Sequence, residues 1–110
     1  MSNQQIGNIV ELLRVGQLAM ELWRAEQQAV VAKDAYHEQV RQYEIVCNGG
    51  HRIKLDPNDS RQAGIIEFTG ERYRALQRAK KAVYSAKLKL RRACKAADMA
   101  VNVVAAGGAQ

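Results

Sequence analysis

The chain has 110 residues, of which 47% are hydrophobic and 25% charged, and its formal net charge is +6. This length suits a single domain, residues 1–110, and the composition is typical of a folded soluble protein. No apolar stretch approaches the roughly 20 residues that cross a bilayer, whereas the basic balance indicates an anionic partner.

The first predicted element is a helix from about residue 4 to residue 45, a stretch without proline. Apolar residues recur in it at alternating spacings of three and four, with one break at Gln39, which is the pattern of a heptad-like helical stripe. The stripe consists of Val15, Leu18, Leu22, Ala25, Ala29, Ala32, Tyr36 and Tyr43.

Turn-forming residues gather in the tip that follows, at about residues 46–64. Asn48, Gly49 and Gly50 are expected to end the first helix, because glycine readily adopts the positive φ of a C-terminal cap.

Two interpretations of the rest of the tip are open. In one, Asp56 caps a helix that begins near Pro57. In the other, the β-prone runs 51–55 and 65–69 form a short β-hairpin before a helix capped by Thr69.

The last predicted element is a helix at about residues 65–106, followed by a frayed tail at 107–110. Its apolar stripe has no polar interruption, and each of the two helices would be about 50 to 60 Å long at about 1.5 Å per residue. The stripe consists of Leu76, Ala79, Val83, Ala86, Leu90, Ala93, Ala97, Ala100 and Val104.

In both stripes a larger residue alternates with alanine, so two backbones can approach closely and the stripes match each other. We therefore expect an all-α fold, a long antiparallel helical hairpin with a coiled-coil-like, alanine-rich seam and an irregular tip. The charge distribution agrees, because residues 1–44 carry a net charge of −2 and residues 71–110 carry +8. Exposed pairs between the two helices should contribute well under about 1 kcal/mol each.

A second apolar stripe lies on another side of the first helix. Because a two-helix rod buries little surface for its mass, we expect this stripe to be an interface with Trp23 as its anchor. A homodimer that forms a four-helix bundle is the simplest closed arrangement. Alternatively, the C-terminal segment 99–106 or the tip folds back over the stripe, while a membrane surface fits its acidic neighbours poorly. The predicted interface residues are Ile6, Ile9, Leu13, Met20, Trp23 and Val30.

The stretch 72–95 holds ten lysine or arginine residues and no acidic one. A helix surface of mixed charge would be equally soluble, so we predict an anionic partner for this basic strip. The alternative is a solvated face that the acidic first helix balances. The residues predicted to bind the partner are Arg74, Arg78, Lys81, Tyr84, Leu88, Arg91, Arg92 and Lys95.

Motifs for catalysis or metal binding are not found in the sequence. His37 and His51 lack a spaced acid or nucleophile, and the two cysteines lack the spacing of a zinc site. We therefore expect no enzyme, metal, cofactor or small-molecule substrate. Unpaired cysteines and an N-terminus unlike a signal peptide indicate a reducing, cytoplasmic location, with a virion as an alternative.

These features are typical of a small accessory protein of a phage or mobile element, such as a virion component or an inhibitor of a host complex. The first hypothesis is a non-enzymatic interaction protein that self-associates or docks through the first helix and presents the basic second helix to an anionic protein surface. The alternative is a sequence-nonspecific nucleic-acid-binding protein, in which the strip contacts phosphates and Tyr84 or Tyr73 stacks on an unpaired base.

Overall fold

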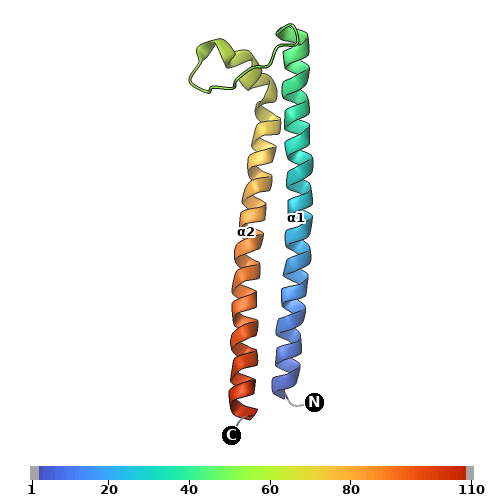
Figure 1. Cartoon of the computed structure of the whole chain (residues 1–110), viewed down its shortest axis with the longest axis vertical. Coiled ribbons are helices and arrows are strands. Elements are labelled where there is room, and N and C mark those ends of the chain that lie inside the picture. The colour runs from blue at the N-terminus through green and yellow to red at the C-terminus, as the bar shows by residue number, and fades with distance from the viewer. Residues whose placement is uncertain (1–2, 109–110) are drawn as a thin grey trace. The chain divides into compact units, whose positions relative to one another are not determined.

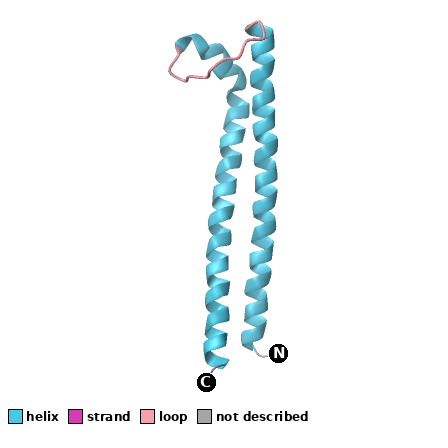
Figure 2. Ribbon diagram, in the orientation of Figure 1, coloured by secondary structure: helices cyan, strands magenta, loops and turns pink. Residues whose placement is uncertain are grey.

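The computed structural model describes the backbone of residues 3–108 and the side chains of residues 3 and 5–102. Its elements are α1 (Asn3–Cys47), the short 3₁₀ helix η1 (Ser60–Gln62) and α2 (Ala63–Gly108) (Figure 1). None of the described residues lies in a strand (Figure 2), so the expected all-α helical hairpin is confirmed. The end of the tail for which fraying is expected, residues 109–110, lies outside the described residues.

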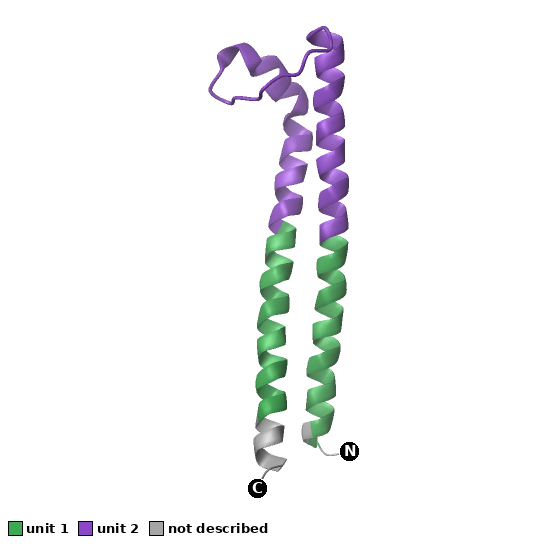
Figure 3. Cartoon of the chain, in the orientation of Figure 1, with its two compact units in different colours: residues 1–25, 82–110 green, residues 26–81 purple. Residues whose placement is uncertain are grey.

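The chain divides into two compact units, each built from a segment of α1 and a segment of α2 (Figure 3). Unit 1 comprises residues 1–25 and 82–110, and unit 2 comprises residues 26–81. Each unit has its own part of the seam.

In unit 2 the C-terminal part of α1 runs antiparallel to the N-terminal part of α2 (Figure 3). Ile65 and Leu76 are buried. Ring pairs link the two helices, since the centroids of Tyr36 and Tyr73 lie 5.6 Å apart and those of Tyr43 and Phe68 lie 5.7 Å apart. The predicted seam positions of unit 2 that are half-buried are Ala29, Ala32, Tyr36, Tyr43 and Ala79.

In unit 1 the N-terminal part of α1 runs antiparallel to the C-terminal part of α2 (Figure 3). Leu18, Ala93 and Ala97 are buried, so two of these three core positions hold only a methyl group. The half-buried seam positions are Val15, Leu22, Ala25, Val83, Ala86, Leu90 and Ala100. The side chain of Val104, the last predicted seam residue, lies outside the described residues.

The end of α1 follows the expected glycine signal. The carbonyl oxygen of Glu44 accepts hydrogen bonds from the N–H groups of Asn48 (3.1 Å) and Gly50 (2.9 Å), and the N–H of His51 donates to Asn48 O at 3.0 Å. The central residues of this tight turn, Gly49 and Gly50, have φ of +59° and +82°. Both values lie in the left-handed region, as in a type I′ turn, which L-residues other than glycine enter at a cost.

The expected β-hairpin in the tip is wrong, because residues 65–69 belong to α2. Ile65 and Thr69 lie one helical turn apart, and both are buried, with exposed fractions of 1% and 3%. The Thr69 hydroxyl donates to Ile65 O at 2.7 Å, so it is satisfied inside the helix rather than serving as an N-cap. Burial of these two positions, together with the packing of Phe68 against Tyr43 of α1, outweighs the β-propensity of the run.

The helical interpretation of the tip is closer to the structure, but the helix does not begin at Pro57 with Asp56 as its cap. Asp56 begins a turn, since its carboxylate accepts from Asn58 N–H at 3.0 Å and its carbonyl accepts from Asp59 N–H at 3.1 Å. Helical structure begins with η1, where Asp59 is the N-cap and accepts from the N–H of Arg61 at 3.0 Å. The cap is therefore the second aspartate of the tip, not the first.

Candidate binding surfaces

The predicted basic strip is exposed in both units at all but one of its positions. In unit 2, Arg74, Arg78 and Lys81 are exposed. In unit 1 the exposed members are Tyr84, Arg91, Arg92 and Lys95. Leu88 differs from the prediction, because it is half-buried and offers only part of its side chain to a partner.

The lysines and arginines of this strip form no ion pair with an acidic side chain among the described residues. Among the described residues, the ion pairs are Arg41 with Glu44, Arg52 with Glu44, and Arg61 with Asp59. The pairs expected between an acidic first helix and a basic second helix are therefore not formed. The positive charge of the strip is therefore not compensated by ion pairs among the described residues.

The predicted interface stripe of α1 is uncovered. Its unit 1 members have exposed fractions between 41% for Ile9 and 62% for Leu13, with Trp23 at 57%. Val30, its member in unit 2, is 52% exposed. These side chains are exposed, so the alternative in which the C-terminal segment or the tip folds back over the stripe is not seen among the described residues. The unit 1 members are Ile6, Ile9, Leu13, Met20 and Trp23.

Glu44 holds the chain in place at the end of α1, a role that the apolar pattern of the seam did not predict. It is only 2% exposed, and its carboxylate accepts from the backbone N–H of Ile53 at 2.7 Å and from Arg41 at 3.2 Å. The hydrogen bond from Ile53, then the contacts with Arg41 and Arg52, lower the pKa of Glu44. Arg41 also donates to Gly50 O at 3.0 Å, so the pair fixes the chain where it leaves α1. One signal in the sequence could have identified Glu44. An acidic residue in the last turn of a helix is disfavoured by the helix dipole unless its carboxylate has partners.

Gln39, the one break in the first seam, has a side-chain oxygen that is buried and has no hydrogen-bond partner. It lies beside Arg72 in the lining of a small pocket of about 160 Å³ in unit 2. An unsatisfied buried acceptor is destabilising by about 1 to 3 kcal/mol. This acceptor therefore lowers the stability of the seam locally.

A larger pocket, the tip pocket, lies in unit 2 where the tip meets the two helices. It has a volume of about 400 Å³. Its lining combines apolar and aromatic side chains with a single charged group. The lining residues are Tyr36, Leu55, Pro57, Ile66, Gly70, Tyr73 and Arg74.

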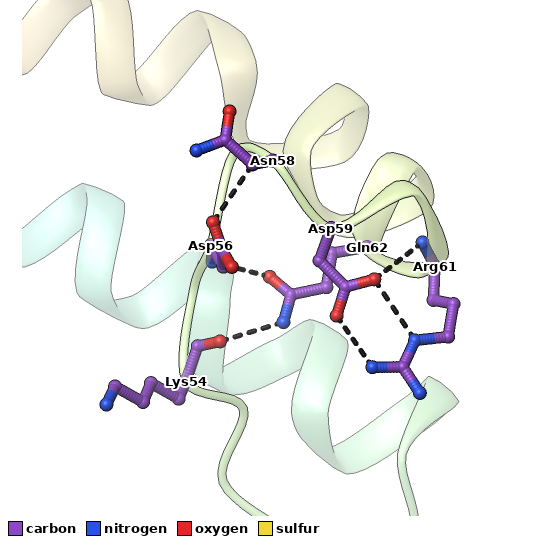
Figure 4. Close-up of polar contacts among 6 residues, drawn as sticks. All are labelled: Lys54, Asp56, Asn58, Asp59, Arg61 and Gln62. Carbon is purple, nitrogen blue, oxygen red and sulfur yellow. Dashed lines mark hydrogen bonds and ion pairs between the residues drawn. The ribbon is translucent and has the colours of Figure 1, made fainter.

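The tip wall of this pocket is held by polar contacts (Figure 4). The Gln62 side chain accepts from Asp56 N–H at 2.7 Å and donates to Lys54 O at 2.8 Å, so it ties the backbone on both sides of Leu55. Asp59 binds Arg61 through two side-chain hydrogen bonds of 3.1 and 3.0 Å, which lower the pKa of Asp59. The loop that carries Leu55 is thus ordered by its own side chains.

The two histidines, His37 and His51, are exposed. The ring of His37 packs against that of Tyr36, at a centroid distance of 5.8 Å. Within the described part of the chain, no group of three or more histidine, cysteine or acidic side chains is placed to hold a metal ion. No helix in that part is long and apolar enough to cross a membrane.

Comparison of the chain with protein-family models, curated proteins and solved structures found no match. The surfaces above are therefore the basis on which function is inferred.

Proposed function

We propose that the protein is a non-enzymatic interaction protein that self-associates through the apolar stripe of α1 and presents the basic strip of α2 to an anionic protein surface. The observation that carries the proposal is the exposure of the stripe residues of unit 1, all of them at least 41% exposed.

The free energy available from covering this stripe is large. Complete burial of one such side chain stabilises by about 1.5 to 3 kcal/mol, and roughly half of that remains to be gained at half exposure. The buried hydrophobic residues among those described are few, namely Leu18, Ile65, Leu76, Ala93 and Ala97. A second copy would supply a core that one chain lacks.

The charges beside the stripe favour a second copy as its occupant. Glu11 and Glu21 alternate with Arg14 and Arg24 along this part of α1. A surface with both signs of charge can pair with the same surface of an identical chain. Its two carboxylates would instead repel an anionic membrane or a polyanion. A closed dimer that completes a four-helix bundle is the arrangement we propose.

The basic strip is the second part of the proposal. Its cations are exposed and without acidic partners among the described residues, so they would steer an anionic surface toward α2. Tyr84, at 66% exposed, offers apolar area to anchor that surface.

One observation favours nucleic acid as a second candidate partner. Tyr84 stands between Lys81 and Lys87 in sequence and is more exposed than Tyr73, at 66% against 48%. An exposed ring among cations suits stacking on an unpaired base while the cations contact phosphates.

Sedimentation equilibrium of the wild type and of a Trp23→Asp variant tests self-association. We expect a wild-type dimer and a monomeric variant, because a carboxylate in the centre of the stripe would have to be buried. Val46→Asp is the matched control, since Val46 is 80% exposed and lies off the stripe, and it should remain dimeric. Reducing agent is required because Cys47 and Cys94 are exposed free thiols. A monomeric wild type at millimolar concentration refutes this half of the proposal.

Binding to labelled single- and double-stranded DNA and RNA and to polyglutamate, each at rising salt, separates the two partner classes. Binding to polyglutamate that an Arg91→Glu/Arg92→Glu variant loses supports the protein partner. Micromolar binding to nucleic acid with a steep inverse salt dependence favours the second candidate, and its absence at about 50 mM salt eliminates that candidate.

A further inference from the structure

The tip pocket has the size of a small-molecule site. Its volume of about 400 Å³ falls within the range of roughly 300 to 1,000 Å³ that is usual for ligand pockets. This volume is sufficient for one aromatic ring with a short substituent. The pocket lies entirely within unit 2.

The walls of the pocket keep apolar area in contact with solvent. Leu55 is 37% exposed, Ile66 39% and Tyr73 48%. Tyr36 and Tyr73 form a tilted ring pair at the pocket. Aromatic rings add favourable edge and offset contacts with another ring beyond the area they bury.

The electrostatics of the pocket are positive. Arg74 is the one charged residue in the lining, and it has no ion pair or hydrogen bond with the described residues. Burial, and then the neighbouring Tyr73, raise the pKa of Tyr36, so this phenol stays neutral at pH 7. An anionic group is therefore the polar group that the lining would accept.

Gly70 makes room for this cation. A Cβ atom at position 70 would lie 3.2 Å from the Arg74 Nη1 atom, so the guanidinium lies against the bare backbone of α2. A guanidinium can bind a carboxylate with two parallel hydrogen bonds.

We propose that the tip pocket binds a small aromatic carboxylate, with its ring against Tyr36 and Tyr73 and its carboxylate on Arg74. Such an acid is either free or the last residue of a peptide. The tip wall is already ordered by Gln62, so the site is formed without a large rearrangement (Figure 4). The proposal concerns a bound ligand and stands independently of the dimer, while Arg74 is shared between the pocket and the basic strip.

Titration of the ¹⁵N-labelled chain with 3-phenylpropionate, followed by amide chemical shifts, tests the site. We expect saturable shifts that include Leu55, Ile66 and Gly70. The neutral 3-phenylpropanol keeps the ring and should bind at least about tenfold more weakly, because it loses the hydrogen bonds to a charged group. Propionate keeps the charge and should also bind at least about tenfold more weakly, because it loses the apolar contacts of the ring.

Variants identify the cation. Arg74→Gln should weaken 3-phenylpropionate about tenfold, while Arg78→Gln, one turn along α2 and outside the lining, should leave binding unchanged. Gly70→Ala keeps every charge but crowds the guanidinium, so it should weaken the acid and not the alcohol. Circular dichroism of each variant confirms that it is folded.

Three results would overturn the proposal: shifts that do not include the pocket residues, equal affinity for the acid and the alcohol, or equal effects of the substitutions at 74 and 78. N-acetylphenylalanine distinguishes the two sources. Tighter binding than 3-phenylpropionate assigns the ligand as a peptide C-terminus, and weaker binding assigns it as a free acid.

Discussion

Glu44 is a buried acid that helps to hold the chain where it leaves α1. A buried carboxylate is tolerated only when its oxygens are hydrogen-bonded, and here a backbone N–H from the tip and the guanidinium of Arg41 meet that condition. The same interactions lower its pKa, so folding is linked to its ionisation.

Glu44→Gln should lower the stability of the protein at neutral pH and make it less sensitive to acid. Because the folded pKa of Glu44 is lowered, its contribution is complete above the ordinary glutamate pKa of about 4.3. That contribution is lost as pH falls through the lowered value. Thermal unfolding followed by circular dichroism from neutral to acidic pH measures the difference. The exposed Glu67, changed to Gln, is the control, and equal pH slopes in the Glu44 variant and the wild type would contradict the expectation.

The packing of Gly64 against Tyr43 gives a second prediction for a single residue. A Cβ atom at position 64 would lie 2.7 Å from the Tyr43 hydroxyl oxygen but 3.8 Å from Tyr43 Cζ. Because Phe68 packs beside the ring of Tyr43, we expect Gly64→Ala to destabilise by about 1 to 3 kcal/mol, as overpacking does. In a Tyr43→Phe background the clash disappears, and the same change should cost nothing. Urea denaturation of the wild type, the two single variants and the double variant measures the coupling between positions 43 and 64. Additive effects of the two substitutions would show that the Tyr43 hydroxyl does not cause the destabilisation.

Periodicity predicted the two helices well, because apolar spacing reports which side of a helix is buried. Every predicted seam position whose side chain is described is buried or half-buried, including the alanines. The tip was harder, since the β-prone run that contains Ile65 and Thr69 becomes helical only through packing against α1. Local propensity does not report such a contact.

Substitution of Gly49, in the turn that ends α1, should change the stability of the protein. Gly49→Ala should destabilise by about 1 to 2 kcal/mol, the cost of a left-handed conformation for an L-residue. Gly49→Asn should cost less, because asparagine enters that region more readily. Urea denaturation measures both, and an alanine variant as stable as the asparagine variant would rule out backbone strain at this turn.

Among the residues whose side chains are described, more large apolar side chains are exposed than buried. If the stripe of α1 closes a dimer, unfolding is coupled to dissociation and the melting temperature depends on protein concentration. Each tenfold increase in concentration should add about 1.4 kcal/mol to the stability of the dimer. Scanning calorimetry of the wild type over a concentration series should show this rise, and Trp23→Asp should abolish it. A melting temperature independent of concentration in the wild type is the opposing result.

The binding surfaces could be predicted only in part. The α1 stripe and the cations of the strip are exposed as expected, because a helix with a known seam fixes which residues point away from it. Leu88 lies nearer the seam than expected, and no interhelical ion pair forms among the described residues. The tip pocket could not be predicted from the sequence, because Tyr36, Leu55 and Arg74 come together only through the conformation of the tip loop. That conformation depends on the hydrogen bonds of Gln62.

The alanine seam sets a limit on how this protein can diverge during evolution. At Ala93 and Ala97, which are 6% and 5% exposed, a larger side chain would push the two helices apart. Related chains should therefore keep alanine, glycine or serine at these two positions, even where their outward residues have changed beyond recognition. A search for distant relatives would gain more from the spacing of small residues than from the identity of the charged ones.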